Sequence, residues 1–293
     1  MAAPLHLHIA SLEDDDPWIV QRKYFMILNN SLQPDSQVSA AEAAAGINEL
    51  TPMNREANGE EAEEPESWCL EFWGTINELV KQIPHDHPSQ DKMVEIIKEL
   101  IALPGVEVFV CKTAITRIWT DLPYLMEVWH EYAVTPKPED GAFEFERWIN
   151  WQAFSARVLQ AGLADWFRLT TRCFRRAFEE EPLQVDEFSE CRIRGAAQWI
   201  EHSGEILFRS LDNLPDFTDL NPGTLYTGKG GLSRERWDFW EASFRALAEN
   251  ENFTEEIVLI CDKTAQKMAA IAANTAVSDE QSHNETATIE DCH

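Results

Sequence analysis

The chain has 293 residues, of which 44% are hydrophobic and 26% are charged, a composition typical of an ordinary globular protein. Its 52 acidic residues outnumber the 24 lysines and arginines, so the formal net charge is −28. This charge disfavours nucleic acids and anionic membrane surfaces as partners.

The sequence predicts a protein that neither crosses a membrane nor enters the secretory route. No apolar run reaches the roughly 18–20 residues of a spanning helix. Residues 1–16 hold no basic region before a long apolar stretch, so no secretory signal is predicted. The six cysteines form no C-x-x-C pair, which argues against a disulfide framework. A cytoplasmic location is therefore expected.

Apolar residues recur at three- and four-residue steps along most of the chain, the pattern of amphipathic helices. Residues 106–110 look strand-like, but they run into helical spacing that continues to Trp119, so a helix is predicted there too. Strand signals are otherwise nearly absent. The predicted helices cover about 17–32, 66–83, 88–103, 106–119, 121–132, 142–162, 164–180, 186–211, 234–249 and 254–273.

These elements predict an all-α fold: a single domain of about eight to ten helices. Residues 1–32 form an N-terminal segment with the first helix, and residues 66–275 form the helical core. Residues 33–65 are alanine-rich and then acidic, with little to bury, so a mobile acidic loop with room for one short helix is expected. Residues 276–293 are polar and aperiodic, which predicts a disordered tail.

No sequence motif establishes a reaction. Residues 223–230 match G-x-x-x-x-G-K, but Gly230 stands where a nucleotide-binding loop has Ser or Thr, and Asn221-Pro222 precedes the match instead of a buried strand. A glycine-rich turn is therefore predicted. The pair Glu127-x-x-His130 alone is too few ligands for a closed metal site. Neither a metal nor a cofactor is expected.

The eleven tryptophans are the most informative feature. Pairs such as Trp148/Trp151 and Trp237/Trp240 are typical of helix cores, because large aromatic side chains dominate core packing. Asn150, Phe154 and Arg157 share one helix face, and polar groups beside aromatic walls are also typical of a pocket for an apolar ligand. Sequence alone does not separate these two interpretations.

Four ordered motifs between Trp68 and Met268 resemble a filamentous-fungal family of helical proteins classed as a domain of unknown function. They are Trp119-x-Asp121-Leu122-Pro123, Trp148-x-Asn150-x-x-Ala153-Phe154-x-Ala156-Arg157, Ala196-Ala197-x-Trp199-Ile200-x-x-x-Gly204 and Tyr226-x-Gly228-x-x-Gly231-Leu232-Ser233-x-x-Arg236-Trp237-x-Phe239-Trp240. The resemblance implies a helical intracellular protein, some of whose relatives are encoded among genes of fungal secondary metabolism. It implies no catalytic residues.

Two functions follow as hypotheses. The first is a cofactor-independent enzyme of fungal secondary metabolism that shapes a small apolar polyketide or terpenoid for cyclisation or isomerisation, for example an intramolecular cycloaddition. Its candidate catalytic residues are Arg157, Asn150 and Arg236, which would polarise the substrate. Its candidate substrate-binding residues are Trp119, Phe154, Trp199, Trp237 and Trp240. The alternative is a non-catalytic helical adaptor with an acidic surface. The oligomeric state is not predicted.

Overall fold

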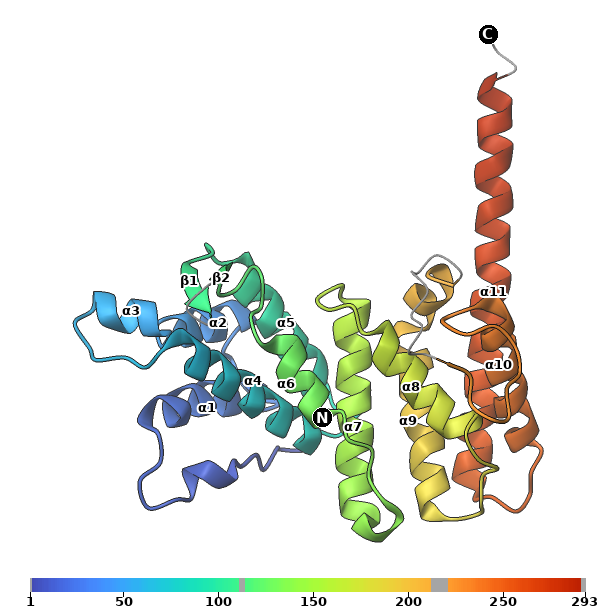
Figure 1. The fold of residues 1–293 in the computed structure, drawn as a ribbon, viewed down its shortest axis with the longest axis horizontal. Helices are drawn as coiled ribbons and strands as arrows, with labels where there is room; N and C mark the ends of the chain where they lie inside the picture. Colours follow the sequence, from blue (N-terminus) through green and yellow to red (C-terminus); the bar gives the residue numbers. More distant parts are fainter. Residues whose placement is uncertain (1, 111–113, 212–220, 291–293) are drawn as a thin grey trace. The chain divides into compact units, whose positions relative to one another are not determined.

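The computed structural model describes residues 2–110, 114–211 and 221–290, and the fold is predominantly helical (Figure 1). Helices account for 64% of it, and the one sheet is a two-stranded hairpin, so the predicted all-α fold is confirmed. The elements are η1 Ala10–Leu12, α1 Ile19–Leu32, α2 Ala40–Asn48, α3 Pro52–Ala57, α4 Pro65–Gln82, α5 Ser89–Ala102, β1 Glu107–Val110, β2 Ala114–Arg117, α6 Leu125–Tyr132, η2 Pro138–Asp140, α7 Gly141–Gln160, α8 Phe167–Phe178, α9 Glu187–Arg209, α10 Arg234–Ala248 and α11 Glu255–Glu290.

The chain divides into two compact units, a division that the sequence does not predict. The first unit holds Met1–Pro136 and Glu146–Phe154, and the second holds Lys137–Phe145 and Ser155–His293. Helix α7 contributes residues to both units, so the dividing line crosses one continuous helix. Each unit has its own aromatic core.

In the first unit, α1, α2, α4 and α5 pack on one another, and α6 packs on α4. Proline stands in the first turn of α4, where its missing N–H costs nothing. The buried face of α4 presents Trp68 and Phe72, whose rings stack at 5.0 Å between centroids. The ring of Tyr24 from α1 meets Phe72 edge to face at 5.6 Å. Such pairs each contribute about 1 kcal/mol beyond the area that they bury.

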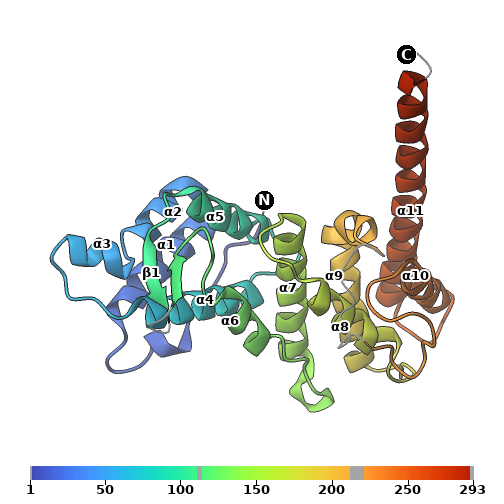
Figure 2. The ribbon, with the colours of Figure 1, turned by 45° about the horizontal axis from the view of Figure 1, so that its top comes forward.

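The helix predicted over 106–119 is wrong. Strands β1 and β2 form an antiparallel hairpin in which Glu107 pairs with Arg117 and Phe109 with Ile115, and β1 lies on α4 (Figure 2). The β-branched residues determine the local structure here because pairing across the hairpin satisfies their backbone groups. Asp121 fixes the end of β2, since its carboxylate accepts the Arg117 N–H at 2.7 Å. Residues 111–113 lie outside the described part of the chain.

Residues 33–65 hold two short helices, α2 and α3, where a loop with one short helix is predicted. Helix α2 begins with a capping box: the Ser39 hydroxyl accepts the Glu42 N–H, and the Glu42 carboxylate accepts the Ser39 N–H. From its sequence, this alanine-rich segment is expected to bury little. In the structure, Ala43 and Ala44 are buried, and their small side chains give α2 a close-packed face. Helix α2 packs on α1 and α5.

In the second unit, α9 and α10 both pack on α11, and α8 packs on α9 and α10. The carboxylate of Asp186 caps α9 by accepting the Ser189 N–H at 2.7 Å, and the Ser233 hydroxyl caps α10 by accepting the Arg236 N–H at 3.2 Å. Phe174 of α8 stacks on Trp240 of α10 with centroids 4.4 Å apart.

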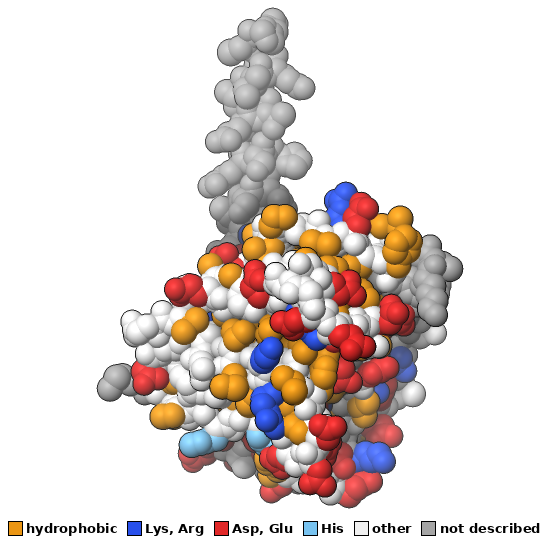
Figure 3. Space-filling model, turned by 90° about the vertical axis from the view of Figure 1, so that its left-hand side faces the viewer, with side chains coloured by type: hydrophobic (Ala, Val, Ile, Leu, Met, Phe, Trp, Pro, Cys, Tyr) orange, Lys and Arg blue, Asp and Glu red, His pale blue; other side chains and the backbone are white. Residues whose placement is uncertain are grey.

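Helix α11 continues to Glu290, so residues 276–290 are helical where a disordered tail is predicted; residues 291–293 lie outside the described part. Residues 212–220 of the long connection between α9 and α10 lie outside it as well. Within the described residues, no helix is both long and apolar enough to cross a membrane. On the face drawn in Figure 3, acidic side chains are spread among hydrophobic ones.

Candidate functional site

The residues predicted to act on a substrate are all buried, but they fall in both units. Trp119, Asn150 and Phe154 belong to the first unit. The second unit holds the remaining five, namely Arg157, Trp199, Arg236, Trp237 and Trp240. Of these eight residues, the structure joins Arg236 and Trp240 through a shared hydrogen-bond partner.

In the first unit, the three residues pack against aromatic side chains or form hydrogen bonds that join elements. Trp119 meets Trp68 and Phe72 edge to face, and its indole N–H donates to the Asn48 side chain at 2.8 Å. This bond ties the end of the hairpin to α2.

Asn150 and Phe154 lie on α7, where both are buried. The Asn150 amide donates to the Lys81 carbonyl at 2.9 Å, near the C-terminus of α4. The ring of Phe154 lies 5.9 Å from that of Trp129 on α6. Both side chains therefore hold helices together.

Among the remaining candidates, Arg157 is 9% exposed on α7 and Trp199 is fully buried on α9. Trp237 packs edge to face on Phe208 with centroids 5.0 Å apart. Its indole N–H is buried and has no hydrogen-bond partner among the described residues. An unsatisfied buried donor costs about 1–3 kcal/mol, so this atom is a place where a ligand or water could bond.

The most tightly organised polar group in the second unit surrounds Glu179, the residue that follows α8. Two nitrogens of the Arg236 guanidinium donate to its carboxylate at 2.7 and 2.8 Å, which makes a bidentate ion pair with both side chains fully buried. The Trp240 indole donates to the same carboxylate at 2.8 Å, and the Gly223 N–H donates at 3.1 Å. We call Glu179, Arg236 and Trp240 the Glu179 cluster.

The Glu179 cluster anchors the loop at residues 221–231. The Leu225 N–H donates to the Glu179 carbonyl at 2.8 Å, and the third Arg236 nitrogen donates to the Gly231 carbonyl at 2.7 Å. A Cβ at Gly223 would overlap the Glu179 backbone, which explains the glycine there. The G-x-x-x-x-G-K match is thus a turn, as predicted, and its first amide is already bonded to a protein carboxylate.

Sequence reasoning identified Arg236 and Trp240 but missed Glu179. It stands first in the run Glu179-Glu180-Glu181, which resembles a solvated acidic stretch. The position of Glu179 in the sequence is the one indication that it is buried. Phe178 is the last apolar residue of the α8 pattern, so the next residue lies at the edge of the buried face.

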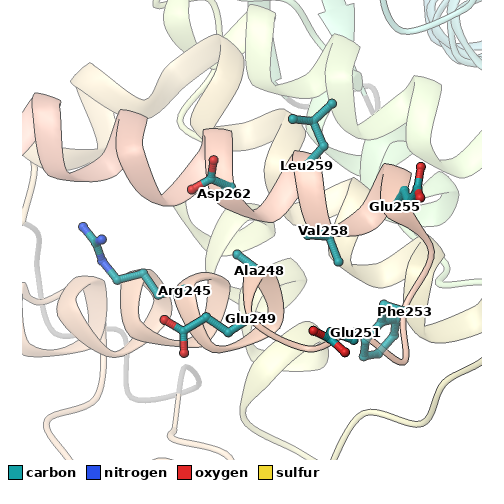
Figure 4. Close-up of a pocket in the computed structure, with 9 residues that line it drawn as sticks. All are labelled: Arg245, Ala248, Glu249, Glu251, Phe253, Glu255, Val258, Leu259 and Asp262. Atoms are coloured by element: carbon teal, nitrogen blue, oxygen red, sulfur yellow. The ribbon is translucent and has the colours of Figure 1, made fainter.

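A second feature is a groove of about 640 Å³ between the end of α10 and the start of α11, which we call the α10–α11 groove (Figure 4). Ala248 and Val258 face each other across its floor, Phe253 closes one end and Leu259 adds an exposed apolar side chain. Four exposed carboxylates and one arginine complete the lining: Glu249, Glu251, Glu255, Asp262 and Arg245.

The charge of the groove is unbalanced. Arg245 is already paired with Glu241 at 2.7 Å. None of the four groove carboxylates forms an ion pair with another residue that the structure describes. Glu255 stands in the first turn of α11, where a negative charge stabilises the helix dipole. Asp262 accepts a hydrogen bond from the Gln266 side chain at 2.8 Å, one turn further along α11.

A smaller hollow of about 290 Å³ shares Phe253 with the groove. Its apolar lining comes from α8, α10 and the glycine-rich loop, and includes Phe178, Leu225 and Leu247. None of the eight predicted site residues lines either of these two hollows.

A family model described as "Protein of unknown function (DUF3632)" matches residues 73–244, more than half of the chain. The chain belongs to the DUF3632 family. No curated protein and no solved structure matches it. The DUF3632 match includes all eight predicted site residues and the Glu179 cluster, but it ends one residue before Arg245, where the groove begins.

Burial suppresses the reactivity of three cysteines in the described part of the DUF3632 chain. Burial raises the pKa of Cys69 and of Cys261 to about 12, and it also raises the pKa of Cys173, so these thiols stay protonated at neutral pH. No group of three or more His, Cys, Asp and Glu among the described residues could hold a metal ion.

Proposed function

We propose that this protein is a non-catalytic helical interaction protein, and that its α10–α11 groove binds a basic amphipathic segment of a partner protein. The main support for this proposal is the combination of an apolar floor with carboxylates at the rim that form no ion pair with the described residues. An apolar anchor of the partner would cover Val258 and Leu259, and lysines or arginines beside that anchor would meet Glu249 and Glu251.

Two physical arguments favour a peptide segment over a small molecule. The groove is open to solvent and does not enclose a compact ligand, whereas a peptide segment can lie in such a groove with one side exposed. Its rim carries charges of one sign, which steer an oppositely charged partner and add a little affinity each. The net charge of −28 adds to the same attraction at long range.

The test is a fluorescence anisotropy titration with a labelled model peptide of leucine and lysine at helical spacing. Saturable binding is expected for the protein, and no binding for a matched peptide with glutamate in place of lysine. The variant with Glu249→Gln and Glu251→Gln should bind about 3- to 10-fold more weakly, because each exposed ion pair contributes up to about 1 kcal/mol. Leu259→Ser should weaken binding through the apolar contact.

The matched control is Glu99→Gln, an exposed glutamate on α5 in the first unit, which should leave the affinity unchanged. Equal binding by the groove variants and the parent protein would contradict the proposal. So would failure of the leucine and lysine peptide to bind at low ionic strength.

The cofactor-independent cyclase or isomerase of fungal secondary metabolism is the second candidate. The buried, unpartnered indole N–H of Trp237 favours it, since that donor could polarise a carbonyl of a small apolar substrate. Arg236 is a weaker candidate than the sequence suggests, because Glu179 and Gly231 accept its hydrogen bonds. A hydrophobic fluorescent probe that binds the parent protein and not the folded Trp237→Phe variant would support this function.

A further inference from the structure

Helix α8 concentrates positive charge in a strongly acidic protein. It contains four arginines and no acidic residue within twelve positions, namely Arg168, Arg172, Arg175 and Arg176. The whole chain has 24 basic residues, so a sixth of them lie on this one short helix. The DUF3632 match covers all of α8.

The arginines share one side of the helix. Arg168, Arg172 and Arg176 follow one another at four-residue steps, so their side chains project from the same face. The opposite face is buried and apolar, with Leu169, Cys173 and Phe174. Arg168 and Arg172 are exposed, and Arg175 and Arg176 are half-buried.

Amphipathicity explains why polar residues stand on this face, but it does not explain four charges of one sign. Arg175 pairs with Glu180 at 3.2 Å. Arg172 and Arg176 form no ion pair with any residue in the described part of the chain. Burial and then the neighbouring Arg172 lower the pKa of Arg176, whereas Glu180 opposes this effect. The two guanidiniums therefore repel each other, and Glu180, which pairs with Arg175, offsets this repulsion only in part.

Helix α9 adds another guanidinium at the end of α8. Arg192 donates to the Arg176 carbonyl at 3.1 Å, so its head group lies at the C-terminal turn of α8. Burial lowers the pKa of Arg192, and the nearby Asp186 and Glu181 partly compensate. Arg192 itself is buried and also donates to the Ser189 hydroxyl at 3.2 Å, so its hydrogen bonds are used within the protein. We call Arg172, Arg175 and Arg176 the α8 arginine face.

We propose that the α8 arginine face binds a small soluble ligand that carries phosphate groups. Guanidinium forks match phosphate oxygens in geometry and donate two hydrogen bonds at once, which makes arginine the preferred residue for this chemistry. A phosphate between Arg172 and Arg176 would replace their mutual repulsion with two attractive contacts. This proposal is independent of the α10–α11 groove, since the two sites share no residue.

The net charge decides between a small ligand and a macromolecular one. Electrostatic interactions are screened over about 8 Å at physiological ionic strength, so a small anion on α8 experiences mainly the local arginines. A membrane or a nucleic acid is an extended array of negative charge, and it would also meet the acidic surface that gives the chain its charge of −28.

Isothermal titration calorimetry with inorganic tripolyphosphate tests the site. The parent protein should bind it with an affinity that falls as salt is raised. The double variant Arg172→Gln, Arg176→Gln should lose at least 10-fold in affinity, and the single charge reversal Arg172→Glu, at an exposed position, should do the same with less risk to folding. Circular dichroism and the melting temperature of each variant establish that it is folded.

The matched control is Arg209→Gln, which removes the same charge from an exposed arginine on α9 of the same unit and should leave the affinity unchanged. Absence of tripolyphosphate binding, or equal binding by parent and α8 variants, would overturn the proposal. Binding to anionic phosphatidylserine vesicles or to RNA without binding to tripolyphosphate would overturn it as well, because the ligand would then be macromolecular.

Discussion

At the scale of single residues, the Glu179 cluster shows how a buried charge is stabilised by its surroundings. Each carboxylate oxygen of Glu179 accepts hydrogen bonds from two groups, and Arg236 also donates to a backbone carbonyl. Full hydrogen bonding offsets the cost of removing both charges from water. The pair therefore specifies how the glycine-rich loop and α10 fit onto α8.

Replacing one partner of this pair should be costly. Glu179→Gln leaves the Arg236 charge buried without its counter-ion, so the free energy of unfolding should fall by about 3–5 kcal/mol. Urea denaturation followed by circular dichroism measures this change. The matched control is Glu241→Gln, which breaks the partly exposed pair with Arg245 and should cost about 1 kcal/mol or less. Similar losses for the two variants would mean that the buried pair is not a determinant of stability.

Gly223 offers a test of the close approach between the loop and Glu179. A methyl group there would overlap the Glu179 backbone, so Gly223→Ala should destabilise the protein by about 1–3 kcal/mol. Gly74→Ala is the contrasting variant. Gly74 lies within α4, and a Cβ added there would lie at an ordinary contact distance of 3.7 Å from the Tyr132 hydroxyl. Alanine favours a helix, so this second change should leave stability equal or raised. Melting temperatures distinguish the two outcomes.

At the scale of elements, the sequence predicts most helices because their apolar faces repeat at the helical period. The prediction fails at β1 and β2, where the preference of β-branched residues for strands competes with the helical spacing of apolar residues. Each segment alone is ambiguous, and the hydrogen bonds between the two strands decide the structure. It also misses partners that come together only in three dimensions. Arg236 and Trp240 were predicted from their pattern, whereas Glu179, 57 residues before Arg236, could be joined to them only by the fold.

The capping box of α2 predicts a pH dependence. Hydrogen bonds from the Ser39 backbone and hydroxyl lower the pKa of Glu42. A carboxyl whose folded pKa lies below its unfolded value stabilises the helix at neutral pH, and this contribution is lost as the pH falls through the folded pKa. Ser39→Ala should therefore raise the Glu42 pKa, whereas Ser39→Thr retains a hydroxyl and should leave it low. Nuclear magnetic resonance titration of the Glu42 carboxyl carbon measures both, and equal pKa values in all three proteins would contradict the assignment.

At the scale of the whole molecule, the distribution of charge matters more than its total. The α10–α11 groove and the α8 arginine face lie in the same unit and carry opposite signs. Within a screening length of about 8 Å, each can attract its own class of ligand despite the net charge of −28. A prediction from composition uses only the total charge, which is why the sequence indicates an acidic surface, disfavours anionic partners and gives no indication of an anion site on α8.

The division into two units predicts that each core can be weakened separately. Phe72 and Phe244 are fully buried, one in each unit, and truncating either to alanine should cost about 3–5 kcal/mol of local stability. Native-state hydrogen exchange should then show faster exchange in α4 and α5 for Phe72→Ala, and in α8 and α10 for Phe244→Ala, with the other unit close to the parent protein. Helix α7 supplies residues to both units, so its amides should respond to both variants. Faster exchange through both units in either variant would mean that the chain unfolds as one cooperative body, and that continuity through α7 couples the two cores.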